Sequence, residues 1–185
     1  VDGDVQNESF ELINDPRVEA SQDALVQQFD FLNEILEEVS AAHEAIMDIR
    51  SVRKQLNAYK SRIKDKEAME AIVEEIDMIN KKMQSIEENL YQTKNRSRQD
   101  PLNFPIRLTN KLAHLNSLVG GSDFAPTDQA VAVKEELSAA IQVELEAFKA
   151  IKASDIKALN ASIDAAKIDA IIIANPKTDF YNPNS

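Results

Sequence analysis

The sequence contains no cysteine and no tryptophan, and it has little glycine or aromatic content. The absence of cysteine excludes disulfide bonds, thiolate metal sites and a cysteine nucleophile. Of the 185 residues only 3 are glycine, and aromatic residues make up 5% of the chain. Sheet-rich domains usually contain more of both, so this composition favours helices. The chain is long enough for one domain with a sizeable apolar core.

Long apolar runs are also missing. The longest candidate, residues 170–174 with the sequence AIIIA, is far shorter than the roughly 18 residues of a membrane-spanning helix, so we expect no membrane span. The first four residues, VDGD, are acidic and lack an initiating Met, which is unlike a signal peptide. We therefore expect the chain to be a mature or excised piece of a longer protein.

Positive charge is scarce relative to negative charge. The chain has 21 Lys and Arg against 32 Asp and Glu, a formal net charge of -11 and a sequence pI of about 4.7. A protein that binds a phosphate backbone needs a basic face. We therefore expect no nucleic-acid partner.

The apolar residues predict a bundle of amphipathic helices. Residues 1–14 look like an extended lead-in, either a short strand or a disordered tail. Asp15-Pro16 has the residue types of a helix N-cap and first turn, and this helix could reach about residue 60. Its expected apolar stripe is Leu25, Phe29, Leu32, Leu36, Val39, Ala42, Ile46, Ile49 and Leu56.

Charge changes sign along this first helix. Residues 1–45 hold twelve acidic residues and one basic residue, whereas residues 46–66 hold seven basic residues and two acidic ones. Acid near the N-terminus and base near the C-terminus complement the helix dipole. A solvated face is the favoured interpretation, and a docking surface for a partner is the alternative.

A turn near Ser61–Asp65 leads to a second helix, because the apolar residues from Met69 to Leu90 follow heptad-type spacing. Prolines interrupt the next segment, so residues 91–104 are expected to form a long loop. Pro105 then opens a short third helix, which Gly120-Gly121 ends.

Thr127, after Pro126, is the predicted N-cap of a fourth helix, whose expected stripe includes Val133 and Ile141. Ser154 is expected to cap a fifth, shorter helix. Residues 168–173 look extended. The predicted organisation is a lead-in over 1–14, a helical bundle over 15–166 and an extended tail over 167–185.

Two histidines and several paired glutamates are the candidates for chemistry. Three residues before His43 lies Ser40, and three before His114 lies Lys111, so neither has the Glu-x-x-His spacing of a di-iron bundle. We expect satisfied, partly buried histidines, no metal and no cofactor. Adjacent glutamates such as Glu87-Glu88 are expected to face water rather than to perform acid–base work. No phosphate loop or nucleophile motif is present, which favours a non-catalytic chain.

The long loop and the start of the third helix are basic within an acidic protein. Between residues 91 and 111, five basic residues oppose only Asp100. They are the candidate binding residues: Lys94, Arg96, Arg98, Arg107 and Lys111. They could grip a carboxylate, a phosphate or an acidic partner surface.

The favoured alternative is structural. The arginines and asparagines of the loop would then hydrogen-bond exposed helix ends and pin the loop to the bundle. The third helix is too short to match its neighbours. We therefore expect Tyr91, Leu102 and Phe104 to cover the rest of their apolar stripes.

This basic segment carries a family resemblance. Residues 91–112, YQTKNRSRQDPLNFPIRLTNKL, resemble the C-terminal region of large bacterial exported proteins that have a sortilin-like, BNR/Asp-box β-propeller and are often labelled glycosyl hydrolases. Further agreement comes from residues 15–17 leading into 28–30, from 48–56 and from 126–129. The resemblance therefore covers nearly the whole chain.

The resemblance implies a parent protein in which a propeller and a small β-domain precede the helices. Residues 1–13 would be the last strand or strands of that β-domain. The propeller would carry any glycan or peptide binding, but its Ser-x-Asp-x-Gly-x-x-Trp repeats do not occur in this sequence. The resemblance implies a secreted, periplasmic or cell-surface location and assigns no catalytic residue to this region.

We therefore expect an all-α, up-and-down bundle of four main helices, with a short third helix, a long packed loop before it and a short fifth helix. Its expected function is that of a non-catalytic C-terminal accessory domain with a structural or protein-interaction role. Its partners would be the upstream domains of its own parent chain or a second copy of itself. The alternative is a ligand-binding module that uses the basic loop to bind an anionic group.

Overall fold

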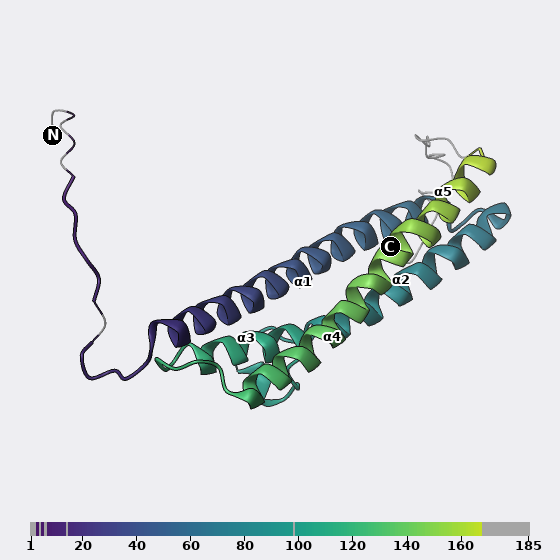
Figure 1. Cartoon of the computed structure of the whole chain (residues 1–185). Coiled ribbons are helices and arrows are strands. Elements are labelled where there is room, and N and C mark those ends of the chain that lie inside the picture. Colours follow the sequence, from purple (N-terminus) through teal and green to yellow (C-terminus); the bar gives the residue numbers. More distant parts are fainter. Residues whose placement is uncertain (1–2, 4, 6, 14, 98, 168–185) are drawn as a thin grey trace.

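The computed structural model describes residues 3, 5, 7–13, 15–97 and 99–167, and it is all-helical over these residues apart from loops and turns (Figure 1). The predicted helical fold is confirmed, and no strand occurs among the described residues of the N-terminal segment. The predicted extended segment 168–173 lies outside the described residues, as does the tail beyond it. The α-helices are α1 (Gln22–Ile63), α2 (Glu70–Leu90), α3 (Leu108–Val119), α4 (Asp128–Ala150) and α5 (Ile156–Ala165).

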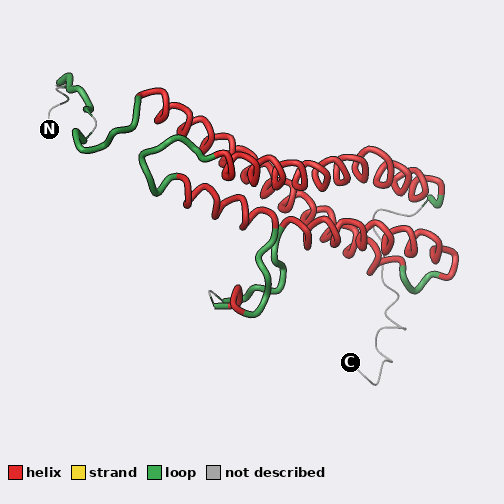
Figure 2. The backbone as a smooth tube through the Cα atoms, turned by 60° about the horizontal axis from the view of Figure 1, so that its bottom comes forward, coloured by secondary structure: helices red, strands yellow, loops and turns green. Residues whose placement is uncertain are grey.

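The helices pack as a bundle, but they are arranged as three rods in up-down-up order rather than as the predicted four helices in up-and-down order. The first rod is α1, and the second consists of α2 and α3, which lie nearly end to end (Figures 1 and 2). Both α2 and α3 pack against α1 and α4. A π-helical turn, Ile151–Asp155, joins α4 and α5 into the third rod. The long loop therefore leaves the bundle at the junction within the second rod.

The first helix begins later than predicted. The start at Asp15-Pro16 is wrong, because Arg17 donates to the Asp15 carboxylate from its backbone N–H at 2.9 Å and from its guanidinium. These bonds hold a turn, and the Asp15 side chain caps no helix. Ser21 is the N-cap instead, since its Oγ accepts a hydrogen bond from the Ala24 N–H at 3.1 Å.

The later helix boundaries follow local hydrogen bonds. Thr127 caps α4 as predicted, with its Oγ1 accepting from the Ala130 N–H at 3.1 Å. The predicted third-helix start at Pro105 is wrong, because the backbone stays extended as far as Arg107 and α3 begins after it. Ser154 caps no helix. Its Oγ donates to the Ala150 carbonyl at 2.8 Å within the π-helical turn, so the helix continues through it.

The core runs the length of the bundle and draws on every α-helix. The predicted α1 stripe is partly misplaced, because Phe29 and Leu36 are exposed while Phe31 and Ile35 are buried. The largest fully buried apolar side chains are Ile35, Ile49, Ile63, Ile76, Met83, Leu90, Leu112, Ile141 and Leu159. Because α1 packs against α2, α3 and α4, its buried arc is displaced from the single stripe that the sequence predicts.

Candidate functional site

The long loop stands away from the helices rather than lying along them (Figure 2). A short 3-10 helix, Asp100–Leu102, lies in this protruding segment, and the Leu102 side chain is 88% exposed. The expectation that Leu102 covers an apolar stripe is therefore wrong. Tyr91 at the root of the loop does pack against the core.

Neutral side chains pin the two ends of the loop together. The buried Gln92 donates from Nε2 to the Pro105 carbonyl at 2.8 Å, and its Oε1 accepts from the Lys94 N–H at 3.2 Å. Thr109 adds a buried hydrogen bond from Oγ1 to the Leu90 carbonyl at 2.8 Å. Loop pinning was expected, but these residues were not, because the sequence does not indicate that Gln92 is buried.

A carboxylate orders the outer part of the loop. Asp100 accepts hydrogen bonds from the backbone N–H groups of Arg96 and Ser97 and, at 2.7 Å, from the Ser97 hydroxyl. These bonds, led by that of the Arg96 N–H, hold the pKa of Asp100 below its usual value. The acid that offsets the basic residues is thus part of the loop structure.

The predicted binding residues do not all converge. Lys94 places its ammonium 5.9 Å from the centre of the Phe104 ring. The Arg96 side chain is exposed and makes no hydrogen bond or ion pair with the described part of the chain. Arg98 lies outside the described residues.

Arg107 and Lys111 are brought together in a cavity of about 370 Å³ beside α4. Asn89 and Glu144 also line it, and they are hydrogen-bonded to each other at 2.9 Å. The Nε atom of Arg107 is buried without a hydrogen-bond partner among the described residues. Two of the five candidates therefore share a pocket, and this pocket also contains an acidic side chain.

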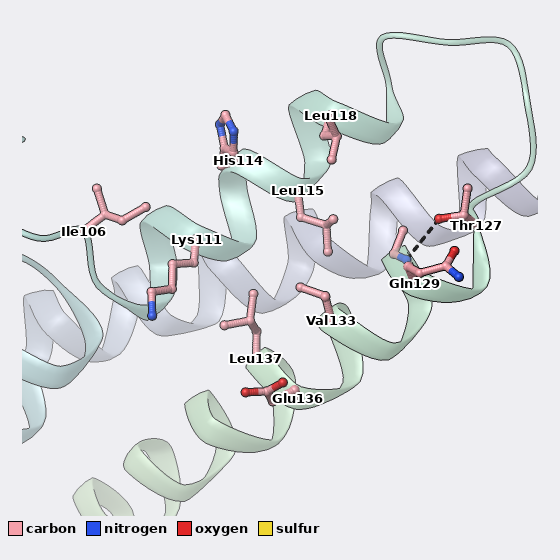
Figure 3. Close-up of a pocket in the computed structure, with 11 residues that line it drawn as sticks. Ile106, Lys111, His114, Leu115, Leu118, Thr127, Gln129, Val133, Glu136 and Leu137 are labelled. Carbon is pink, nitrogen blue, oxygen red and sulfur yellow. Dashed lines mark hydrogen bonds between the residues drawn. The ribbon is translucent and has the colours of Figure 1, made fainter.

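A larger, mainly apolar cavity of about 450 Å³ lies between α3 and α4, and we call it the α3–α4 groove (Figure 3). Leu115, Val133 and Leu137 point toward one another from the two helices, whereas His114 points away. The full lining is Ile106, Lys111, His114, Leu115, Leu118, Thr127, Gln129, Ala130, Val133, Glu136 and Leu137. The ribbon of α1 runs behind this groove, so the opening is on the far side of α3 and α4 from α1.

Exposed apolar side chains accompany the groove. Leu118 at the end of α3 is 68% exposed, and Phe124 in the following loop is 62% exposed. Val133 was predicted to lie in the buried stripe of α4, but its side chain is exposed. No described helix covers the outer side of α3 and α4 here, which is why this part of the stripe stays open.

Both histidines are exposed, so the expectation of partly buried histidines is wrong. His43 packs edge-on against Tyr91, with 6.2 Å between the ring centres. Among the described residues, no group of three or more His, Cys, Asp or Glu side chains could hold a metal ion. No described helix is long and apolar enough to cross a membrane.

Glu87 is buried, with 6% of its side chain exposed, so the expectation that it faces water is wrong. Arg50 donates from Nε to its Oε1 at 2.6 Å, and Arg53 donates from Nη1 to its Oε2 at 2.7 Å. The sequence contained a signal for this burial, because Glu87 lies between Met83 and Leu90 at core-like spacing on α2. Arg50 and Arg53 were expected to lie on a solvated face of the first helix. They instead join α1 to α2 through Glu87.

No family model matches this chain, and neither a curated protein nor a solved structure matches it.

Proposed function

We propose that this chain is a non-catalytic accessory domain that uses the α3–α4 groove to hold an apolar surface of another protein module. On the basis of the sequence resemblance, that module is the part of an exported sortilin-like parent protein that precedes the bundle. The observation that carries this proposal is the concentration of uncovered apolar side chains around the groove. Exposed patches of apolar side chains often mark sites of protein–protein interaction.

Leu118 and Val133 line the groove, and Phe124 lies in the loop between α3 and α4; all three are exposed apolar side chains. Fully burying side chains of this type stabilises a complex by about 1.5–3 kcal/mol each relative to exposure. The three are partly covered already, so the available gain is smaller than that full amount. The groove is thus a surface from which binding energy can still be obtained.

The position of the N-terminal segment supports the choice of partner. Phe10, Leu12 and Ile13 are all exposed and lie in the segment that leads into α1. Gln28, near the start of α1, donates a hydrogen bond from its side-chain amide to the Val119 carbonyl at 3.0 Å. The start of α1 therefore lies beside the end of α3. A module connected through this segment would join the bundle at the end where α3 stops and α4 begins, which is also the end that contains the groove.

Binding of separately produced preceding domains tests the proposal, with size-exclusion chromatography and light scattering to measure the mass of the complex. We expect a complex with the unaltered chain and its loss with Leu118→Lys or Val133→Lys. Met78→Lys, which changes an exposed apolar residue of α2, is the matched control and should leave the complex intact.

Absence of a complex with the unaltered chain would overturn the proposal. So would equal weakening by Met78→Lys and Leu118→Lys, because the groove would then have no special role. Circular dichroism of each variant verifies that the helices are retained.

Anion binding by the basic segment is the second candidate. It is favoured by the cavity that Arg107 and Lys111 share and by the buried Nε of Arg107, which has no hydrogen-bond partner in the part of the chain that the structure describes. Titration with inorganic phosphate, followed by NMR, should shift the amide signals around α3 and should fail with Arg107→Gln. If phosphate shifts the two proteins equally, this alternative is wrong.

A further inference from the structure

A separate hollow lies where α1 passes the C-terminal end of α2. We propose that it binds a carboxylate carried on an apolar body. Its volume is about 250 Å³, and it is lined by His43, Ile46, Met47, Arg50 and Tyr91. This inference does not depend on the α3–α4 groove, which uses none of these residues.

Arg50 provides the group that would recognise the carboxylate. Its Nε donates to the buried Glu87 carboxylate at 2.6 Å, which fixes the guanidinium on one side. Its terminal nitrogens make no hydrogen bond or ion pair with any described residue, and 52% of the side chain is exposed. A guanidinium whose two terminal nitrogens have no partner among the described residues can match the two oxygens of a carboxylate.

Tyr91 further restricts the Arg50 guanidinium, which lies 5.6 Å from the centre of its ring. His43 packs edge-on against the same ring. The order Glu87, Arg50, Tyr91, His43 therefore forms a continuous chain of contacts from the buried carboxylate to the surface. A donor held this way before the ligand arrives loses little side-chain entropy on binding.

The other walls of the hollow favour an apolar body on the ligand. Ile46 belongs to the buried core, while the neighbouring Met47 is exposed. A thioether side chain adapts to ligand shape and makes favourable contacts with aromatic rings. The hollow therefore combines one charged donor with apolar and aromatic walls, the usual composition of a small ligand site.

The charged side chains around the hollow favour a ligand that carries a single negative charge. The buried Glu87 is shared by Arg50 and Arg53, so these three side chains together carry one net positive charge. None of the five lining residues is acidic. On α1 the hollow spans residues 43–50, where Glu44 and Asp48 are the acids, and Asp48 lies 3.8 Å from the Lys152 ammonium. Residues 50–63 of the same helix hold five basic residues and no acid. A monoanionic carboxylate therefore meets a favourable field without a like charge in the wall.

Titration of the 185-residue chain with benzoate, followed by NMR, tests the site. Benzoate has the planar carboxylate and the apolar body, and benzamide is its uncharged counterpart. We expect saturable shifts of the Arg50 Nε–H and Met47 methyl signals with benzoate and none with benzamide. Arg50→Lys keeps the positive charge but removes the planar pair of donors that matches a carboxylate. Benzoate binding should therefore weaken by about tenfold or more.

Lys54→Ala is the matched control. It removes one positive charge from the exposed surface of the same helix, one turn further along, and should leave benzoate binding unchanged. Shifts that grow linearly without saturation would overturn the proposal, and so would equal binding by the Arg50→Lys protein or by benzamide. Arg50 is half-exposed, and circular dichroism of its variant separates loss of binding from loss of the fold.

The carboxylate could come from a free small acid or from an acidic side chain of a protein. Titration with acetyl-Leu-Glu-Leu-amide, with acetyl-Leu-Gln-Leu-amide as control, distinguishes these sources. Tighter binding of the Glu peptide than of benzoate assigns the site to protein segments, and the reverse assigns it to free acids. Failure of both probes to bind contradicts the site while leaving the function proposed for the groove untouched.

Discussion

The part of the bundle where α2 meets α1 and α5 differs from the part where α3 meets α4. In the first part, large apolar side chains such as Ile63, Ile76 and Leu159 are fully buried. In the second part, Leu118 and Val133 of similar character remain exposed beside an open groove. The two parts use the same kinds of residue and the same helical spacing. What differs is whether another segment of this chain covers them.

The difference shows that apolar spacing predicts a helix face but not its neighbour. On α4, both Val133 and Ile141 lie on the predicted stripe, yet only Ile141 is buried. No described helix covers the outer face of α3 and α4 at the groove. The following predictions compare the closed part with the open one.

The largest expected effect comes from truncating the closed part. Ile76→Ala should lower the free energy of unfolding by about 2–5 kcal/mol, because it leaves a cavity in a fully buried site. Leu118→Ala at the groove should change it by no more than about 0.5 kcal/mol, as expected of a surface substitution. Urea unfolding followed by circular dichroism measures both. Similar losses for the two variants would abolish the contrast between the two parts.

The next effect concerns the charge pairs that join α1 and α2. Glu87→Gln removes the carboxylate that binds Arg50 and Arg53 and should destabilise the bundle by about 1–3 kcal/mol. Glu88→Gln, one residue along α2 and less buried, is the control and should change the stability little. Thermal unfolding of the two variants gives the comparison. Equal stability would mean that Glu87 contributes no more than its partly exposed neighbour.

A smaller effect is expected where α4 begins, at the open part of the bundle. Thr127→Ala removes the hydrogen bond to the Ala130 N–H and should cost about 1 kcal/mol. Thr93→Ala in the exposed loop removes the same atoms from a site without a capping role and is the control. Hydrogen exchange in the first turn of α4 should accelerate only in the Thr127 variant. Unchanged exchange there would show that the cap is dispensable.

The smallest effect is confined to the protruding loop. Asp100→Asn should speed amide exchange of Arg96 and Ser97 without changing global stability, because the Asp100 carboxylate is exposed. The pKa of Asp100 is lowered in the fold, so its contribution is complete above the ordinary carboxyl pKa. That contribution disappears as the pH falls through the lowered value. Protection of the Arg96 and Ser97 amides that stays constant on acidification, after the intrinsic pH dependence of exchange is removed, would contradict this assignment.

Much of the fold follows from sequence spacing, and little of the site does. The heptad-type spacing of Met69 to Leu90 predicted α2, and the residue type of Thr127 predicted its cap. Asp15 had an equally suitable residue type, but Arg17 bound its carboxylate and kept it from capping a helix. Competition of this kind depends on geometry that one sequence does not contain.

The candidate sites were harder to predict for a related reason. Glu87 and Arg50 are far apart in sequence, and charge counting alone placed both in water. The basic residues of the loop were easy to find as a cluster, but the loop extends away from the bundle and separates Lys94 from Arg107 and Lys111. The sequence did not predict the groove, because whether another helix covers α3 and α4 depends on how the helices are arranged in space.

The most direct test of the central claim uses the absence of cysteine in this chain. Leu118→Cys and Met78→Cys each introduce a single exposed thiol, one at the groove and one on α2. The labelling rate of each is measured in the isolated chain and in a protein that joins it to the preceding domains proposed above. We predict that Cys at position 118 reacts several-fold more slowly in the joined protein, while Cys at position 78 reacts at the same rate in both. Equal rates at position 118 in the two proteins would contradict a groove that holds a neighbouring module.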